Sequence, residues 1–173
     1  MSSERIQSRI GPEILELLDL QKAMFLSSIT PDGDPYASYA PFAIEDDGFY
    51  VLLSELALHA VNLLKTPKAA ALIVEDESHA KDLFARKRVS YSFTAQPIPR
   101  DSEQWHNGVA CLVARHGERS QNLSQLGDFH LFKLVVTRGR FVKGFGKAFE
   151  FSGPNVCGES MVHLRDGHLT TKA

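Results

Sequence analysis

Short apolar runs bounded by turn residues dominate the first third of the chain. Residues 24–29, 36–44 and 49–53 are rich in aliphatic and aromatic side chains, and two polar linkers, 31–34 (Pro-Asp-Gly-Asp) and 46–48 (Asp-Asp-Gly), separate them. Proline presets φ for a turn and glycine tolerates positive φ, so both linkers are typical of tight turns. The pattern predicts three strands joined as an antiparallel meander.

The strand pattern returns further along the chain and is interrupted by glycines. It recurs at residues 69–74, 88–96, 129–136 and 148–151. Residues 138–140 (Arg-Gly-Arg) predict a break or bulge before a continuation at 141–142, and residues 144–146 (Gly-Phe-Gly) predict a second bend, as glycines do at the corners of barrels. From residue 153 onward the sequence shows little periodicity.

Between these runs the apolar residues follow the 3.6-residue period of amphipathic helices. The expected helices are residues 11–20, a segment with Ser54 as N-cap that Pro67 stops, a short segment at 80–85, and a helix opened by a capping box of Asp101 with Gln104.

The order of these elements predicts a mainly β fold with flanking helices. About six strands, mostly antiparallel, fit a single six-stranded barrel, and a two-sheet sandwich is an alternative that the pattern leaves open. A chain of 173 residues is the size of one domain. We divide it into an N-terminal helical segment at 1–20, a barrel domain at 21–152 and a C-terminal tail at 153–173.

Composition narrows the class of protein. The formal net charge of −2 argues against a nucleic-acid partner. The two cysteines, Cys111 and Cys157, lack the spacing of a metal site and are expected to be free thiols in a reducing compartment. The first residues lack the apolar stretch of a signal peptide, and no apolar run approaches the ~20 residues of a membrane span. We therefore expect a cytoplasmic protein with no membrane partner.

Histidines and one basic cluster are the candidate chemistry, because the sequence has no dinucleotide-binding, P-loop, serine-hydrolase or zinc-protease motif. His59 falls on the apolar stripe of its helix, where it is either a core or interface histidine or a group that reaches a ligand. His163 and His168 lie in the tail and are either exposed or metal ligands. Residues 86–88 (Arg-Lys-Arg) form either a solvated strand edge or an anion contact.

Six segments carry a more specific signal because they occur together and in one order over about residues 20–150. They are 33–42 (GDPYASYAPF), 54–63 (SELALHAVNL), 75–77 (EDE), 84–88 (FARKR), 128–132 (DFHLF) and 139–148 (GRFVKGFGKA). Taken together they resemble the heme-utilisation (HutZ/HugZ-type) branch of the pyridoxamine 5′-phosphate oxidase-like, FMN-binding split barrels.

The resemblance implies a six-stranded antiparallel split β-barrel that forms a homodimer, with its ligand site at the subunit interface. It implies heme b as the ligand and an axial histidine near the C-terminus, for which His168 is the first candidate and His163 the second. Asp128 matches a carboxylate that hydrogen-bonds this histidine across the dimer. His59 matches a helix histidine of the branch, and its role stays open. Arg86 or Arg88 would meet a propionate.

Heme chemistry makes sense of these residue types. A neutral imidazole can ligate heme iron and leaves the opposite face for O2. A carboxylate on the other ring nitrogen fixes the tautomer and makes the ligand more basic. We therefore expect a protein that binds heme and degrades it with O2 and an external reductant of unassigned identity. A heme carrier or store without turnover is one alternative, and an FMN-binding oxidoreductase is another.

Overall fold

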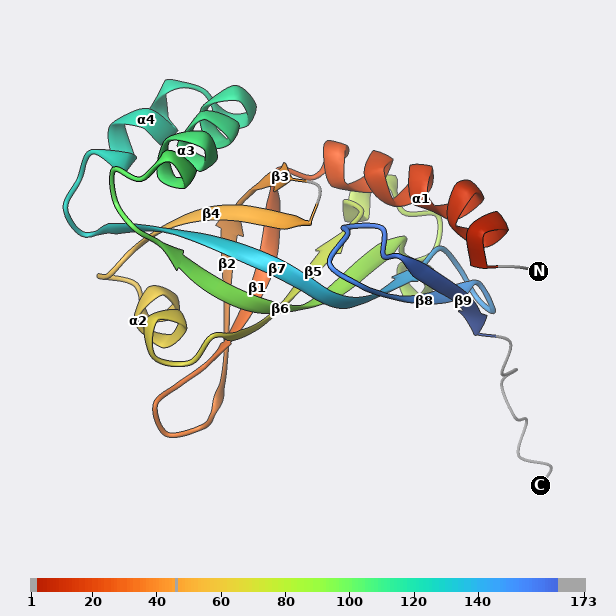
Figure 1. Cartoon of the computed structure of the whole chain (residues 1–173). Coiled ribbons are helices and arrows are strands. Elements are labelled where there is room, and N and C mark those ends of the chain that lie inside the picture. Colours follow the sequence, from red (N-terminus) through yellow and green to blue (C-terminus); the bar gives the residue numbers. More distant parts are fainter. Residues whose placement is uncertain (1–2, 46, 165–173) are drawn as a thin grey trace.

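The computed structural model describes residues 3–45 and 47–164, which form one curled antiparallel sheet with helices around it (Figure 1). Two single turns of 3-10 helix, η1 (Glu77–His79) and η2 (Leu83–Ala85), lie in the loop between residues 74 and 88. The helices are α1 (Ser3–Leu20), α2 (Leu58–Lys65), α3 (Glu103–His116) and α4 (Glu118–Ser124). The strands are β1 (Ala23–Ile29), β2 (Pro35–Pro41), β3 (Ala43–Glu45), β4 (Gly48–Ser54), β5 (Lys68–Val74), β6 (Arg88–Ile98), β7 (Phe129–Val142), β8 (Ala148–Ser152) and β9 (Ser160–Leu164).

The long strand β7 organises the sheet. The strand order is β2-β1-β5-β6-β7-β4-β3, and β8 and β9 are added on the β4 side of β7. The first half of β7 pairs with β4, whereas its last five residues pair with β8. Strand β7 therefore runs between two ends of the molecule, one carrying β4 and α2 and the other carrying β8 and β9 (Figure 1).

The two faces of the sheet are filled differently because side chains alternate along each strand. One face, which we call the covered face, lines the barrel interior and packs against α1. Its core includes an aromatic cluster of edge-to-face and stacked rings, which are Phe42, Phe49, Tyr91, Phe93 and Phe151. Buried rings of this kind each contribute on the order of 1.5–3 kcal/mol to folding.

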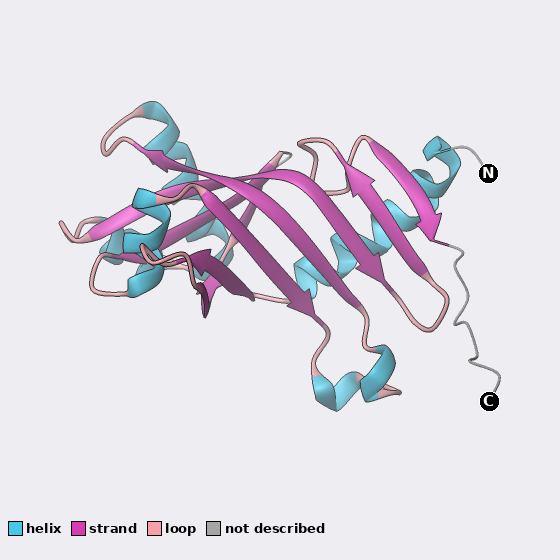
Figure 2. Ribbon diagram, turned by 90° about the horizontal axis from the view of Figure 1, so that it is seen from below, coloured by secondary structure: helices cyan, strands magenta, loops and turns pink. Residues whose placement is uncertain are grey.

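The opposite side of the same strands, which we call the open face, has no helix over it in strands β5–β9 of the described chain. Figure 2 shows these strands directly, with α1 behind them. The alternation is visible in β6, where Val89 and Tyr91 are buried and Ser90 between them is exposed. No helix among the described residues has the length and apolar character needed to cross a membrane.

The mainly β, split-barrel class is confirmed, and the expected number of strands is corrected from six to nine in the described chain. The expected strand 36–44 is divided at Phe42 into β2 and β3. Strand β9 was not predicted, because its residues lie in the segment without clear periodicity. Helix α1 begins eight residues before the expected start and continues through Pro12.

Two predicted helix caps are wrong. Helix α2 begins at Leu58, and its N-cap is Ala57 rather than Ser54. The N-cap of α3 is Ser102, whose Oγ accepts a hydrogen bond from the Trp105 N–H at 3.1 Å. Asp101 instead adopts a left-handed φ of 62°, which aspartate tolerates better than most residues.

The sequence predicts a break or a bulge at residues 138–140; β7 is continuous there, so the break is wrong, but a register shift of the bulge type lies beside Arg138. The irregularity in its pairing with β6 lies just before, where Ser92 pairs with Arg138 but Phe93 pairs with Val136. Gly139 serves a different purpose: a Cβ at this position would overlap the ring of Phe151 on β8. The glycine is therefore needed for close packing on the covered face rather than for a bend.

Candidate functional site

Asp128 is positioned where β7 begins, beside the last residue of β4. Strand β4 ends at Ser54, which is in register with Phe129. The Ser54 hydroxyl donates to Asp128 Oδ2 at 2.5 Å, and the Glu55 N–H donates to the Asp128 carbonyl oxygen at 2.8 Å. These two bonds fix both the backbone and the side chain of the aspartate. The same Ser54 hydroxyl accepts a hydrogen bond from the Leu56 N–H at 3.1 Å.

The second carboxylate oxygen of Asp128 is available. Oδ1 takes no hydrogen bond from the described residues, and the residue is partly exposed. The residues next to Ser54 and Phe129 form a second polar pair, in which His130 Nε2 lies 2.5 Å from Glu55 Oε1. An ionised carboxylate with a free oxygen at the surface is suited to accept an N–H from a group that approaches from outside.

His59 lies on α2 with a defined tautomer. Its Nδ1 is 3.0 Å from Ser38 Oγ, and the Ser38 hydroxyl donates to the Leu26 carbonyl oxygen at 3.1 Å. A hydroxyl has one proton, so it must accept from His59, which places the imidazole proton on Nδ1. The Nε2 lone pair is then free. Burial lowers the pKa of His59, so the ring is neutral at pH 7.

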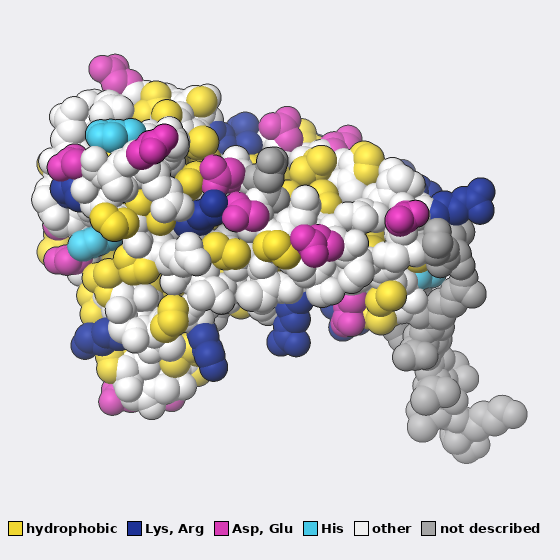
Figure 3. All heavy atoms as spheres, in the orientation of Figure 1, with side chains coloured by type: hydrophobic (Ala, Val, Ile, Leu, Met, Phe, Trp, Pro, Cys, Tyr) yellow, Lys and Arg dark blue, Asp and Glu magenta, His cyan; other side chains and the backbone are white. Residues whose placement is uncertain are grey.

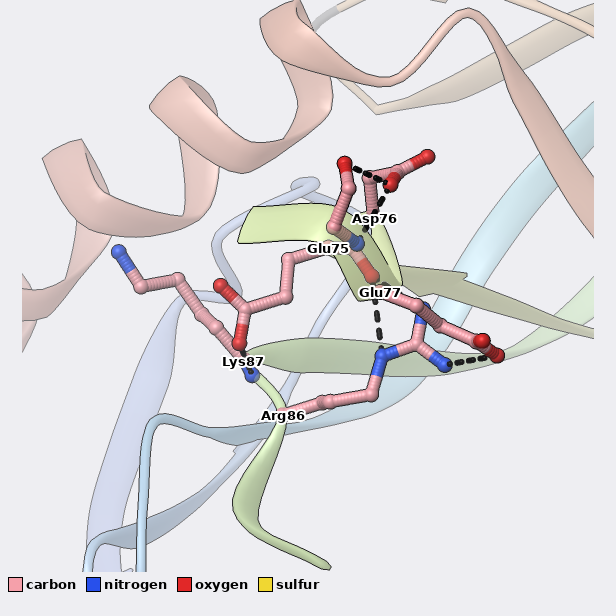
Figure 4. A network of polar contacts seen from close by, with 6 residues as sticks. Glu75, Asp76, Glu77, Arg86 and Lys87 are labelled. Carbon is pink, nitrogen blue, oxygen red and sulfur yellow. Dashed lines mark hydrogen bonds and ion pairs between the residues drawn. The ribbon is translucent and has the colours of Figure 1, made fainter. Parts of the chain in front are cut away.

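Arg86 holds the loop that carries η1 and η2 (Figure 4). Its Nε donates to the Glu75 carbonyl oxygen at 3.1 Å, Nη2 donates to the same oxygen, and Nη1 lies 3.2 Å from Glu77 Oε1. The Lys87 N–H donates to Glu75 Oε1 at 2.6 Å. The guanidinium of Arg86 is thus used within the loop, which makes this residue a weaker anion contact than the sequence predicts.

Arg88 lies at the start of β6, on the open face. Its Nη1 donates to the Arg86 carbonyl oxygen at 2.9 Å, which leaves the other end of the guanidinium available. The register places two further arginines on the open face of β7: Arg140 is a diagonal neighbour of Arg88, and Arg138 lies two positions further along the strand. Neither arginine was predicted from the sequence as a site residue. The one signal available was their alternation with Gly139 and Phe141, which is the period of a strand.

His163, the second candidate for an axial ligand, lies on β9. Its ring stacks on Phe149 with centroids 4.6 Å apart, and its Nε2 lies 3.1 Å from the Gly146 carbonyl oxygen. A carbonyl can only accept, so Nε2 carries the proton. The ring is therefore already used in packing and in a hydrogen bond. His168, the first candidate, lies outside the described residues.

The structure does not bring Asp128 and His163 together within one chain. Asp128 precedes the first residue of β7. His163 on β9 is in register with Phe149 on β8, and Phe149 is in register with Phe141, one residue before the end of β7. The two sites therefore lie at opposite ends of the sheet, and Figure 1 shows β9 at one end and α2, which follows β4, at the other. Arg88 lies at the same end as β9, because it pairs with Val142.

Comparison with known proteins places the chain in a family. The model of the pyridoxamine 5′-phosphate oxidase family matches residues 10–143. Heme oxygenase HutZ of Vibrio cholerae serotype O1 is 43% identical over 168 residues, which are 97% of this chain and 94% of HutZ.

Solved structures agree with this placement. A crystal structure of V. cholerae HutZ, named there a heme storage protein, has a TM-score of 0.73 at 44% identity and covers 78% of this chain and 95% of that chain. The crystal structure of Campylobacter jejuni ChuZ has a TM-score of 0.82 at 28% identity and covers 96% of this chain and 67% of that chain. The chain therefore belongs to the pyridoxamine 5′-phosphate oxidase family of split β-barrels, in the branch that includes HutZ.

Proposed function

We propose that the protein binds heme b as a substrate and degrades it with O2 and an external reductant, releasing iron. The names of its relatives support this proposal, since HutZ is called a heme oxygenase and its crystal structure a heme storage protein. The observation that carries it is the geometry of Asp128, whose carboxylate is held by Ser54 with one oxygen left to accept a proton donor.

In this proposal His168 of one subunit ligates the heme iron and donates its other ring N–H to Asp128 of the second subunit. Bound heme supplies the iron at which O2 reacts. The carboxylate fixes the histidine tautomer and raises the basicity of the ligand, which stabilises ferric iron. Ser54 keeps the carboxylate aimed at the ligand. His163 is the second choice for the ligand, because its ring is already engaged.

The reach of the chain supports a site shared between two subunits. Asp128 lies thirteen residues before Phe141, the β7 residue aligned with His163, which is a strand path of about 40 Å at ~3.3 Å per residue. The five residues from His163 to His168 extend at most ~18 Å. The tail is therefore too short for His168 to reach Asp128 of the same chain. We assign the contact between His168 and Asp128 to a homodimer in which the segment 153–173 reaches the partner.

The open face supplies a surface for such a dimer. Phe25 and Tyr39 are paired across β1 and β2, and they are 60% and 67% exposed in the single chain. Leu72 on β5 continues the same row beside Phe25. Adjacent exposed aromatic side chains on a sheet face mark an interaction site, and a second copy is the partner that also completes the Asp128 site.

Apolar groups next to Asp128 fit a porphyrin. Leu56, in the turn that follows Ser54, and Leu58, the first residue of α2, are 91% and 42% exposed. A flat apolar macrocycle could cover both while its iron lies within reach of the ligand held by Asp128. The free Nε2 of His59 is on the helix that follows this turn, and we keep His59 as a candidate heme contact.

An FMN-binding oxidoreductase is a less favourable reading of the same fold. The phosphate of FMN requires cationic or N–H contacts. The sequence offers the cluster at residues 86–88 and scattered lysines for this contact, and Arg86 of that cluster is committed to Glu75 and Glu77. This residue is thus poorly suited to hold the phosphate, which leaves Arg88 as the remaining arginine of the cluster.

A titration tests the proposal. Purified apoprotein is titrated with hemin and, separately, with FMN, and the absorption spectra are recorded. We expect a shifted Soret band with hemin, lost in His168→Ala and kept in His106→Ala, a control that removes an exposed histidine of α3. After ascorbate is added in air, the Soret band should decay.

The possible results separate the readings. A Soret band that persists under ascorbate and air contradicts degradation and favours a heme carrier or store. Bound yellow flavin with no Soret response contradicts the proposal altogether.

A further inference from the structure

The segment that carries Asp128 connects α4 to β7 over residues 125–128, and its own side chains do little to hold it. Leu126 is 48% exposed, and a Cβ on Gly127 would meet nothing within 4 Å. Hydrophobic side chains also show at the surface of this end of the molecule in Figure 3. A glycine directly before Asp128 increases the number of conformations open to the segment. A carboxylate that keeps one position here therefore needs support from another part of the chain.

Arg100 supplies this support from the loop between β6 and α3. Its Nη1 donates to the Ser124 carbonyl oxygen at 2.7 Å. Its Nη2 donates to the carbonyl oxygens of Leu126, at 2.9 Å, and Phe129, at 2.7 Å. Ser124 and Leu126 precede Asp128 in the chain, and Phe129 follows it directly. One guanidinium group thus holds the backbone on both sides of the carboxylate.

Three carbonyl acceptors in this arrangement suit a guanidinium group better than an ammonium group. Arginine presents N–H donors from two terminal nitrogens in one plane, whereas lysine has a single nitrogen. Ser124 is also the last residue of α4, where the helix dipole favours a positive charge. Arg100 is therefore matched to these carbonyls both in the direction of its donors and in its charge.

Arg100 is itself fixed by Trp105 on α3. The guanidinium carbon lies 4.6 Å from the centroid of the Trp105 ring, which is buried. A cation over an aromatic face at this distance is attracted to the ring. Because Trp105 is the single tryptophan of the chain, its fluorescence reports directly on this contact.

Strand β4 restrains the same segment from its other side. The Glu55 N–H donates to the Asp128 carbonyl oxygen, and the Ser54 hydroxyl donates to Asp128 Oδ2. Arg100 holds the residues before and after the aspartate, whereas Ser54 and Glu55 hold the aspartate itself. Together they leave Oδ1 in one defined position.

We propose that Arg100 is a positioning residue for Asp128. By holding the carbonyls on both sides of the aspartate, it keeps Oδ1 where a proton donor at the heme site meets it. This inference rests on the proposed function, from which it takes the role of Asp128, but it does not depend on which group donates to Oδ1. Arg100 acts only through Asp128 and contacts neither heme nor O2.

A double-mutant cycle separates this role from a purely structural one. The variants are Arg100→Ala, Asp128→Ala and their combination, and the control is Arg119→Ala, which removes an exposed arginine of α4. The rate is the initial loss of the Soret band after ascorbate is added to the hemin complex in air. If Arg100→Ala does not fold by circular dichroism, Arg100→Lys, which keeps the charge but has one nitrogen, replaces it.

We expect Arg100→Ala to lower the rate roughly tenfold, as for other groups that orient a metal ligand from behind. Once Asp128 is removed, the loss of Arg100 should have no further effect, so the double variant should match Asp128→Ala. A residue that only stabilised the end of α4 would instead slow both backgrounds by the same factor. Arg119→Ala should keep the wild-type rate.

Chemical rescue gives a second readout. A groove of about 600 Å³ between α3 and α4 reaches Arg100 and Trp105, so a guanidinium ion can enter where the side chain has been removed. Guanidinium chloride below its denaturing range should restore part of the rate of Arg100→Ala and return the Trp105 fluorescence toward that of the wild type. Sodium chloride at the same ionic strength should do neither. In the apoprotein, amide hydrogen exchange at residues 125–129 should be faster in Arg100→Ala than in Arg119→Ala.

The results also separate this inference from the proposed function. A wild-type rate in Arg100→Ala, or an equal loss in both backgrounds, would overturn the positioning role while heme degradation stands. If the wild type binds hemin but does not degrade it, the proposed degradation fails. Arg100→Ala should then still shift the spectrum of the ferric complex in the same direction as Asp128→Ala does, and an unchanged spectrum would overturn the positioning role. If the wild type binds no hemin, both fail.

Discussion

The covered face and the open face belong to the same strands but hold opposite kinds of side chain. On the covered face, Phe49 contacts Phe42, Tyr91 and Phe93 and is fully buried. On the open face, Phe25 has a comparable apolar ring but is 60% exposed in the single chain. The first ring is enclosed by partners from this chain, whereas this chain leaves most of the second ring uncovered.

This difference separates folding from function. The covered face is completed by α1 and the barrel interior, so it is expected to determine whether one chain folds. The open face carries exposed aromatic rings at the β1–β2 side, so it is expected to determine assembly and, through it, the site that two subunits share. The two faces can therefore be perturbed independently, because alternate residues of one strand belong to different faces.

The largest expected effect is on the covered face. Phe49→Ala removes a fully buried ring and should lower the free energy of unfolding by about 3–5 kcal/mol. The matched change Phe25→Ala on the open face should cost much less in the isolated subunit. Urea unfolding of both variants at low protein concentration checks this. Equal losses would show that the open face is part of the folding core.

The next effect is on assembly. Tyr39→Arg puts a charge at the centre of the proposed dimer surface. In the dimer this charge would face either the same residue of the partner or an apolar side chain, so the dimer should be weakened roughly 100-fold. Tyr39 is 67% exposed, so the subunit should still fold. Light scattering and far-UV circular dichroism measure the two properties. A folded dimer of unchanged stability would mean that the subunits meet through another surface.

A smaller effect is expected at the carboxylate. Ser54→Ala removes the hydroxyl that holds Asp128 Oδ2, so the rate of heme loss under ascorbate should fall roughly tenfold, as for other groups that orient a metal ligand. Ser78→Ala is the matched control, because it also removes a serine–aspartate hydrogen bond, with Asp76, but in an exposed loop. Equal rates for both variants would remove the proposed role of Ser54.

The smallest effect is on the pH dependence of stability and concerns the covered face, where His59 hydrogen-bonds to Ser38. Burial lowers the pKa of His59 in the folded state below its value of 6.5 in the unfolded chain. The unfolded chain therefore binds the proton first as pH falls, and stability is full above pH 6.5 and decreases below it. Urea unfolding at pH 7.5 and 5.5 should show a smaller pH-dependent loss for His59→Gln than for the wild type. An identical loss would mean that other groups cause it.

Local sequence signals predicted those parts of the fold that depend on neighbouring residues. The turn at residues 31–34 predicted the β1–β2 hairpin, because proline and glycine set the backbone there. The packing role of Gly139 was not predicted, because the ring that requires it, Phe151, is twelve residues away. The same limit applies to β9, whose short run becomes a strand only by pairing with β8.

The residues of the candidate site were likewise predicted only in part. Asp128 was predicted through the resemblance of its motif, and the structure adds the hydrogen bond from Ser54 that positions it. Arg138 and Arg140 were not predicted, because fifty residues separate Arg88 from Arg138 and only the pairing of β6 with β7 places Arg140 diagonally next to Arg88. Periodicity gives the face of a strand, but the register between strands requires the structure.

The most direct test of the shared site uses mixed dimers. Subunits with His168→Ala and subunits with Asp128→Ala are tagged differently, mixed under dissociating conditions, and the heterodimer is purified. If the ligand comes from one subunit and the carboxylate from the other, one of its two sites is wild type. The heterodimer should then degrade heme at about half the wild-type rate per dimer, although both parent homodimers are impaired. A heterodimer no more active than its parents would contradict the account, since a site within one chain would be damaged in both subunits.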